Sequence, residues 1–174
     1  MERRMPAATP EELFKRLEAL DIQTETITHP AVFTVDEARK HRPGDQSGAH
    51  IKNLFLRNKK KKMWLVVARE DLPIDLKALG AAIGAGRVSF GSPDRLDQYL
   101  GVRPGSVTPF AVINDEEGVV EVVFDRAIFD SELVHCHPLV NTMTTAIKGN
   151  DLLRFLRDTG HEPRLVDIPA PAEA

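Results

Sequence analysis

Residues 53–68 read NLFLRNKKKKMWLVVA, and this stretch sets the pattern of the fold. Two apolar runs, residues 53–57 and 63–68, have the length and side-chain types of β-strands. Between them, Asn58 and four consecutive lysines form a short polar segment. The pattern predicts a β-hairpin whose turn, Asn58–Lys62, carries a run of positive charge.

Helix and strand signals also precede this hairpin. Thr9-Pro10-Glu11-Glu12 combines a capping threonine, a proline suited to the first helical position and a glutamate that completes a capping box. Residues 22–28 alternate and are rich in threonine and isoleucine, which predicts a strand. Residues 34–40 open with a second capping box and predict a short helix, followed by a loop over residues 41–48.

After the hairpin, the sequence predicts a helix over 76–83 and a second helix that begins at Ser92-Pro93-Asp94 and stops at Gly101. A second hairpin is predicted from residues 110–113 and 119–124. The last predicted elements are a strand over 140–147, a helix over 152–156 before Gly160, and a strand over 164–168. Strands and helices mix without a strict βαβ repeat. This favours a single α+β domain with a mixed, partly barrel-like β-sheet flanked by short helices. We expect the domain to span residues 9–168, after an N-terminal extension over 1–8 and before a frayed tail over 169–174.

Composition limits the classes of protein. The 174 residues are 42% hydrophobic and 28% charged, which excludes a mainly disordered chain. The single cysteine, Cys136, excludes an intrachain disulfide. The net charge of −3 means that any nucleic-acid binding is local.

Several familiar patterns are absent from the sequence. No run approaches the roughly 20 apolar residues of a membrane span, and no apolar run follows the basic residues near the N-terminus, so we expect no membrane partner, no secretory signal and a cytoplasmic location. The phosphate-binding Gly-rich loop, GxSxG, CxxC and HExxH are also missing. These absences argue against common nucleotide hydrolases, serine esterases and helix-borne zinc proteases.

Two groups of lysines are candidate phosphate contacts. Lys52 stands at the start of an apolar strand after a polar loop, where an ammonium group either binds a phosphate as a point charge or is simply solvated. Lys59, Lys60, Lys61 and Lys62 form either a solvated turn or a contact with an RNA backbone, which would add salt-dependent affinity without specificity.

The segment 101–109 reads GVRPGSVTP, and its two glycines and two prolines predict a rigid loop with few large side chains. Such a loop is either a plain connector or a device that presents backbone N–H groups to a carbonyl or carboxylate oxygen. The hydroxyl groups of Ser106 and Thr108 add donors.

Histidines mark two further segments. His135 and His137 would face the same side of an extended chain, but a zinc site needs a third ligand, and we expect no metal. His137 is better suited to line a pocket, because Pro138 fixes the chain beside it. His29 ends the first predicted strand, and the apolar turn after it, residues 31–33, either packs or lines a small pocket.

Four segments in register resemble the YbaK-type aminoacyl-tRNA deacylases, which are related to the editing insertion domain of bacterial prolyl-tRNA synthetase. The segments are HPAVFT (29–34), KNLFL (52–56), GVRPGSVTP (101–109) and HPLVNT (137–142), and together they extend over about residues 10–168. The last two are most similar to the free-standing alanine-editing branch (ProXp-ala, also called PrdX).

The resemblance implies trans-editing hydrolysis of mischarged Ala-tRNA(Pro) by water, assisted by a ribose hydroxyl of the substrate and without a cofactor. It implies that Lys52 holds the phosphate or ribose of the terminal adenosine and that His137 lines the aminoacyl pocket. The residues expected to bind the substrate are His29, Val32, Phe33, Gly101, Pro104, Gly105, Ser106, Val107, Thr108 and Asn141. Val32, Phe33 and the region Leu79–Ile83 are expected to set the size of the pocket.

The expected partner is the acceptor end of tRNA(Pro), with prolyl-tRNA synthetase as a further candidate and no DNA. Three alternatives stay open. In the first, the chain is a deacylase whose substrate is Cys-tRNA(Pro) or another small aminoacyl ester. In the second, it is a non-catalytic tRNA- or synthetase-binding module, for which Lys59–Lys62 matter more than Lys52. In the third, it is a metal hydrolase that uses His135 and His137.

Overall fold

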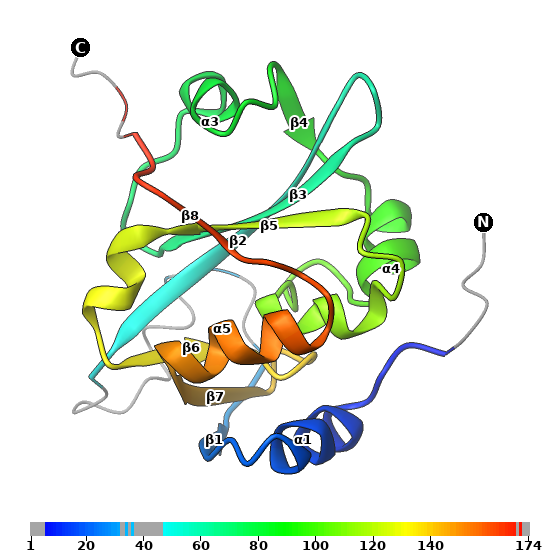
Figure 1. The fold of residues 1–174 in the computed structure, drawn as a ribbon, viewed down its shortest axis with the longest axis vertical. Helices are drawn as coiled ribbons and strands as arrows, with labels where there is room; N and C mark the ends of the chain where they lie inside the picture. The colour runs from blue at the N-terminus through cyan, green and yellow to red at the C-terminus, as the bar shows by residue number, and fades with distance from the viewer. Residues whose placement is uncertain (1–5, 32–33, 35, 37–46, 170, 172–174) are drawn as a thin grey trace.

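A computed structural model of the protein describes residues 6–31, 34, 36, 47–169 and 171. Its strands form one mixed sheet in the order β1-β7-β6-β2-β3-β5-β8, with β4 paired to β2. Figure 1 shows β6, β7 and β1 in the lower half of the molecule and β2, β3, β5 and β8 above them. The long strand β2 (Ala49–Asn58) connects the two halves, which confirms the single α+β domain with a mixed sheet.

The hairpin predicted from residues 53–68 is confirmed. β2 pairs in antiparallel fashion with β3 (Met63–Arg69), and the side-chain oxygen of Asn58 accepts the backbone N–H groups of Lys60 and Lys62 at 3.0 and 3.1 Å. Parallel strands β5 (Val120–Asp125) and β8 (Arg164–Val166) extend the sheet beyond β3, and β4 (Val88–Phe90) lies on the other edge of β2.

The lower half of the sheet contains three strands. β1 (Thr24–Thr28) pairs in antiparallel fashion with β7 (Met143–Lys148), which pairs in the same way with β6 (Leu133–Cys136). β6 joins the first two residues of β2 in parallel. This short junction couples the two halves of the sheet.

The helices follow their capping signals. α1 (Pro10–Ala19) has the predicted capping box, in which Thr9 Oγ1 accepts the Glu12 N–H at 3.2 Å. α3 (Leu76–Ala82), α4 (Pro93–Leu100) and α5 (Gly149–Asp158) are also confirmed. Gly101 ends α4 with a φ of +64°, and Gly160 follows α5 with a φ of +86°, values that favour glycine.

The second predicted hairpin is wrong. Residues Pro109–Asn114 form a 3-10 helix, η1, and β5 pairs with β3 in parallel rather than with a preceding strand. Thr108 caps this helix and Pro109 occupies its first turn, which favours a helical start. The side chains of Pro109–Val112 are all buried, so this apolar run fills the core without pairing in a sheet.

Other boundaries also differ from the sequence predictions. The structure contains three elements that the sequence did not predict: β4, β6 and a second 3-10 helix, η2 (Arg126–Asp130). The strand predicted over 140–147 begins only at Met143. The helix predicted over 34–40 and the loop over 41–48 lie mostly outside the described residues. Within the described part of the chain, no helix has the length and apolar character that crossing a bilayer requires.

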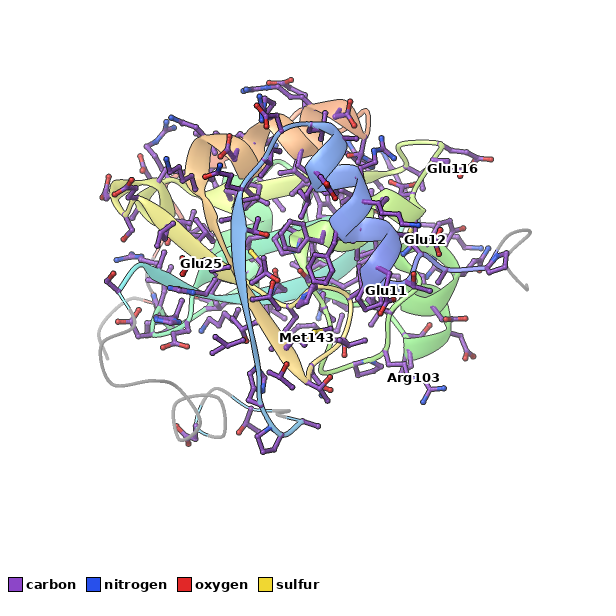
Figure 2. All side chains as sticks on the ribbon, turned by 90° about the horizontal axis from the view of Figure 1, so that it is seen from below. Glu11, Glu12, Glu25, Arg103, Glu116 and Met143 are labelled. Atoms are coloured by element: carbon purple, nitrogen blue, oxygen red, sulfur yellow. The ribbon has the colours of Figure 1, made fainter. Side chains whose placement is uncertain are left out.

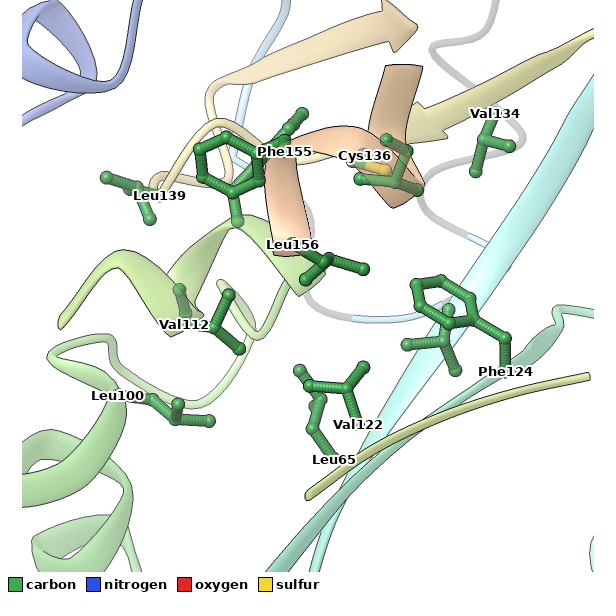
Figure 3. Close-up of a cluster of buried hydrophobic side chains, with 14 of the residues drawn as sticks. Leu65, Leu100, Val112, Val122, Phe124, Val134, Cys136, Leu139, Phe155 and Leu156 are labelled. Atoms are coloured by element: carbon green, nitrogen blue, oxygen red, sulfur yellow. The ribbon is translucent and has the colours of Figure 1, made fainter. Parts of the chain in front are cut away.

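Two apolar clusters cover opposite faces of the hairpin. Side chains alternate along a strand, so Phe55, Leu65 and Val67 belong to the larger cluster, whereas Leu56 and Trp64 belong to the smaller one with α3. The larger cluster is shown in Figure 3, where α5 contributes side chains opposite those of β3 and β5. Each fully buried residue of this kind stabilises the fold by about 1.5–3 kcal/mol.

Candidate functional site

His29 and His137 meet at one end of the lower sheet. β1 ends at Thr28, which is paired with Met143 at the start of β7, so His29 emerges beside β7. Figure 2 labels Met143 at this position. His137 follows β6, the other neighbour of β7. The imidazole rings of the two histidines lie 6.2 Å apart between centroids.

Hydrogen bonds to carbonyl oxygens fix the tautomers of both rings. A carbonyl oxygen only accepts, so His137 Nδ1–H donates to the Met143 carbonyl at 2.9 Å, and His29 Nδ1–H donates to the Pro30 carbonyl at 2.8 Å. His29 Nε2 lies 2.7 Å from Thr144 Oγ1. The Nε2 of neutral His137 is an acceptor, and no described residue is bonded to it.

Burial keeps His137 in its neutral form. Desolvation lowers the pKa of His137 below its ordinary value, the hydrogen bond to Met143 opposes this shift in part, and electrostatic repulsion between the two imidazole rings, which disfavours protonation of both, lowers the pKa further. A half-buried, neutral imidazole with a free lone pair can accept a hydrogen bond from an ammonium, a hydroxyl or a water molecule.

The loop 101–109 borders the larger apolar cluster, whereas His29 bonds to Thr144, which lies on the other face of β7 from Ile147 in that cluster. Val102 is buried in the larger apolar cluster, Val107 packs against it, and Leu139, two residues after His137, belongs to it too. The Gly101 and Ser106 N–H groups are engaged within the chain, bonded to helix α4 and to the Arg103 carbonyl. Thr108 is fully buried, and its hydroxyl oxygen accepts the Phe110 N–H at 3.3 Å.

Backbone donors remain in this loop nonetheless. The N–H groups of Gly105 and Val107, both in half-buried residues, have no acceptor among the described residues. Gly105 has a φ of +91°, a conformation that favours glycine. The loop can therefore present main-chain donors to an oxygen atom, and the Thr108 hydroxyl caps η1.

Lys52 lies on the opposite face of β2. Lys52 is paired with Ala68, its side chain follows the alternation towards the smaller cluster, and its Nζ donates to the carbonyl of Leu72. Strand pairing on one edge of β2 is interrupted near Lys52. On the edge away from β3, β2 pairs with β6 at residues 49–50 and with β4 at residues 56–58, and no described strand pairs with residues 51–54 on that edge.

Asn53 occupies this interruption beside Lys52. Its Oδ1 is buried, and no hydrogen-bond donor reaches it within the described residues. A buried amide oxygen without a donor costs about 1–3 kcal/mol unless a ligand or water supplies one. Sequence reasoning did not select Asn53 as a site residue, although a polar residue within an apolar strand was the available signal.

His135 and Cys136 have other roles. The His135 ring stacks on His50 with centroids 4.4 Å apart, and its Nε2 lies 2.5 Å from the Ser47 carbonyl oxygen, so His135 and His137 have different partners. The part of the chain that the structure describes holds no group of three His, Cys, Asp or Glu side chains that could bind a metal. Burial raises the pKa of the Cys136 thiol far above its ordinary value, so this residue is a protonated core side chain.

The remaining predicted residues are dispersed. Asn141 is half-buried near His137 in sequence, and Pro104 is exposed on the loop. Lys59–Lys62 are exposed at the hairpin turn, whereas Leu79 and Ile83 are buried in the smaller apolar cluster. Val32 and Phe33 lie outside the described residues. A depression between α1 and β1, lined by residues that include Phe14, Glu18, Asp21 and Thr24, contains none of the predicted site residues.

Comparison with known proteins places this arrangement in a family. Residues 29–155 match the model of the aminoacyl-tRNA editing domain. The chain is 41% identical over 165 residues to prolyl-tRNA synthetase associated domain-containing protein 1 of Danio rerio, covering 94% of this chain and 89% of that protein. It is 38% identical to the prolyl-tRNA editing protein ProX of Acetoanaerobium sticklandii, covering 88% and 93% of the two chains.

A solved structure shares the fold. The crystal structure of a candidate trans-editing enzyme for prolyl-tRNA synthetase superposes with a TM-score of 0.72, at 18% sequence identity, over 93% of this chain and 97% of that chain. The fold is thus that of a small α+β editing domain. The chain belongs to the aminoacyl-tRNA editing domain family, a family of deacylases that act on aminoacyl-tRNA.

Proposed function

We propose that this chain is a trans-editing deacylase that hydrolyses the ester bond of mischarged Ala-tRNA(Pro). The observation that carries the proposal is the family match over residues 29–155, a span that contains His29, Lys52, the loop 101–109 and His137. The prolyl system is supported by two relatives whose names refer to prolyl-tRNA or its synthetase, each covered over most of its length. The alanine preference rests on the resemblance of the segments 101–109 and 137–142 to the alanine-editing branch.

The need for such an activity follows from the limits of binding. A synthetase pocket built for proline rejects smaller alanine weakly, because missing methylene groups are worth only about 1–3 kcal/mol each. A second site that admits alanine and excludes proline then hydrolyses the wrong product, which is a double sieve.

The chemistry assigns a role to each group. Water attacks the ester carbonyl, the bond to the ribose oxygen breaks, and that oxygen takes up a proton, with a neighbouring ribose hydroxyl assisting the transfer. The free N–H groups of Gly105 and Val107 bind the carbonyl oxygen as its negative charge develops. His137 Nε2 accepts a hydrogen bond from the aminoacyl ammonium, because Nδ1 already donates to Met143.

Lys52 and Asn53 bind the nucleotide part of the substrate. The Lys52 ammonium carries the positive charge that a phosphate or ribose oxygen needs, and it exchanges the Leu72 carbonyl for the substrate. Asn53 Oδ1 gains the donor that it lacks from a substrate hydroxyl. In this proposal, groups on both faces of β2 reach one ligand through the edge where residues 51–54 have no described strand partner, which supports the assignment.

An attacking water is consistent with the thiol chemistry of the site region. Cys136 is buried, and its raised pKa keeps the sulfur protonated, so it is a poor nucleophile. The proposal therefore needs no covalent intermediate on the protein.

The test is a deacylation panel with Ala-, Cys-, Ser-, Gly- and Pro-tRNA(Pro) and with Ala-tRNA of another identity. We expect release of alanine from Ala-tRNA(Pro), with Pro-tRNA(Pro) left intact. Faster release of cysteine would reassign the substrate, and binding without turnover on every tRNA would make the chain a binding module. Loss of activity in a chelator would favour a metal hydrolase.

A further inference from the structure

We propose that Phe90 and the lysines of the β2–β3 turn form a second RNA contact, on which an unpaired base of the substrate stacks while its phosphates meet Lys59–Lys61. This inference rests on the proposed function, because it assumes an RNA substrate. It assigns a ligand to an aromatic side chain outside the site described above.

Phe90 is exposed although it is large and apolar. Its exposed fraction is 59%, and the other exposed large apolar side chain among the described residues, Val119, reaches only 39%. Phe90 lies on β4 opposite Leu56, and Val88, on the same face of this strand, is buried. The ring therefore starts beside the smaller apolar cluster and extends past it into solvent.

The backbone beneath this ring is fixed. The Gly91 N–H donates to the Phe55 carbonyl at 2.9 Å, which ties the end of β4 to β2. A Cβ atom at position 91 would lie 2.5 Å from the Phe55 ring, so glycine is needed for this close approach. A rigid, exposed aromatic face is suited to stacking on a base, because every base offers a π-face.

Basic residues outnumber acidic ones in the segment that contains Phe90. Residues 51–94, which include most of β2 and all of β3, α3 and β4, contain nine of the 23 basic residues of the chain and four of its 26 acidic residues. This segment has a net charge of +5, and the rest of the chain has a net charge of −8. A local cationic surface on a protein with a net charge of −3 is complementary to a polyanion.

The lysines of the turn remain available to a ligand. Lys62 lies 3.5 Å from Glu121 and over the ring of Trp64, but within the described chain no carboxylate pairs with Lys59, Lys60 or Lys61. The Asn58 side chain holds the turn by two hydrogen bonds. These three ammonium groups therefore extend from a defined turn into solvent.

The spacing suits a short single strand. Phe90 is opposite Leu56, and Lys59, the first lysine of the turn, is three residues after Leu56, which at roughly 3.3 Å per residue is about 10 Å. A single strand of a few nucleotides extends over this distance, and single-stranded binding surfaces combine aromatic platforms with basic side chains in this way. A duplex offers the lysines its phosphates but no free base face, so we assign the unpaired 3′ end of the RNA to this surface.

The experiment measures binding of the full chain to an RNA stem with an unpaired CCA end and to the same stem without that end. Phe90→Leu keeps an apolar side chain but removes the π-face, and we expect about five- to a hundredfold weaker binding of the CCA-ended stem, with little change for the blunt stem. Phe90→Trp should restore the affinity, and its fluorescence should be quenched by the CCA-ended stem. Ala19→Trp, on exposed α1 at the opposite end of the molecule in Figure 1, is the matched control.

The contribution of the lysines is measured by the salt dependence of RNA affinity. Replacing Lys59, Lys60 and Lys61 by glutamine should reduce the slope of log affinity against log salt by about 0.7 for each phosphate that the variant no longer neutralises. Lys15→Gln, on exposed α1, should leave that slope unchanged.

The outcomes separate this inference from the proposed function. Equal binding of wild type and Phe90→Leu, an unquenched Phe90→Trp, or no binding of the CCA-ended stem by wild type would overturn the inference. If the wild type hydrolyses Ala-tRNA(Pro) with a KM that Phe90→Leu does not change, the inference fails and the function stands. If the wild type binds the stem through Phe90 but releases no amino acid, the function fails and the inference stands.

Discussion

His29 and His137 are oriented by consecutive residues of one strand. Thr144 Oγ1 lies 2.7 Å from His29 Nε2, and the Met143 carbonyl accepts the Nδ1–H of His137 at 2.9 Å. Because β7 lies between β1 and β6, it holds one histidine from each neighbour, and the rings lie 6.2 Å apart. The strand therefore determines which nitrogen of His137 is left for a ligand.

This tautomer can be tested with two amides. His137→Asn places an amide near the position of Nδ1 and keeps a donor for the Met143 carbonyl, whereas His137→Gln places its amide near Nε2. We expect Asn to lower the deacylation rate about ten- to a hundredfold, since a hydrogen bond to a charged group is worth about 1.5–3 kcal/mol. Gln should retain more activity than Asn in steady-state deacylation assays, and the reverse order would contradict the assignment of Nε2.

The pH dependence follows from the lowered pKa of His137. Desolvation favours the neutral ring, so as the pH falls through about 6.5 the unfolded chain binds a proton before the folded chain does. The contribution of this group to the free energy of unfolding therefore falls as the pH drops from about 6.5 towards the folded pKa. The enzymatic rate above background should persist to below pH 6.5 before it declines.

NMR titration of the His137 ring measures this directly. A midpoint at or above 6.5 in the folded protein would contradict the burial argument. His137→Asn provides the control for stability, because its denaturation midpoint should lack this part of the pH dependence.

Lys52 should matter far more for activity than for stability. Lys52→Met removes the ammonium group and its bond to the Leu72 carbonyl, which costs about 1 kcal/mol in the free energy of unfolding. Deacylation should fall by at least about a hundredfold, and Lys52→Arg should recover part of it if charge alone is required. Denaturant titration measures the free energy of unfolding, and single-turnover kinetics measure the deacylation rate. Full activity of Lys52→Met would remove this residue from the site.

Replacing Asn53 should leave stability unchanged or raise it, while lowering substrate affinity. Asn53→Leu removes a buried amide oxygen that has no donor within the described structure, so the free energy of unfolding should stay equal or rise by about 1 kcal/mol. Substrate binding should weaken because the expected hydrogen bond is removed. A marked loss of stability together with unchanged KM would show that Asn53 has a structural role instead.

A buried hydrogen-bonded pair of side chains secures the C-terminal part of the fold. Asp115 and His161 are 2.8 Å apart with side chains 2% exposed, and Asp115 also accepts the N–H groups of Val119 and Val120. Asp115→Ala should lower the free energy of unfolding by about 3–5 kcal/mol, because it removes the acceptor of two backbone N–H groups and the partner of the buried His161 ring, and each unsatisfied buried group costs about 1–3 kcal/mol. The exposed pair of Arg157 and Glu162 is the control, and Glu162→Gln should change stability by less than about 1 kcal/mol.

Local chemistry explains which elements could be predicted. The caps at Thr9 and Ser92, the glycine at position 101 and the turn at Asn58 act within a few residues, so the sequence contains their full physical cause. The run Phe110–Ile113 was misjudged because strand and 3-10 helix both bury such residues, and only packing against α4 and α5 distinguishes them.

By itself, the sequence determined the hairpin, the capped helices and, through four short segments, the family. The tertiary structure decided how distant residues are arranged. Thr144 and Met143 orient two histidines from different segments, β2 separates Lys52 from the loop 101–109 by the alternation of its faces, and an interruption in pairing leaves Asn53 without a donor. These relations depend on strand order and register, which arise from contacts between residues far apart in the chain, and no local propensity encodes them.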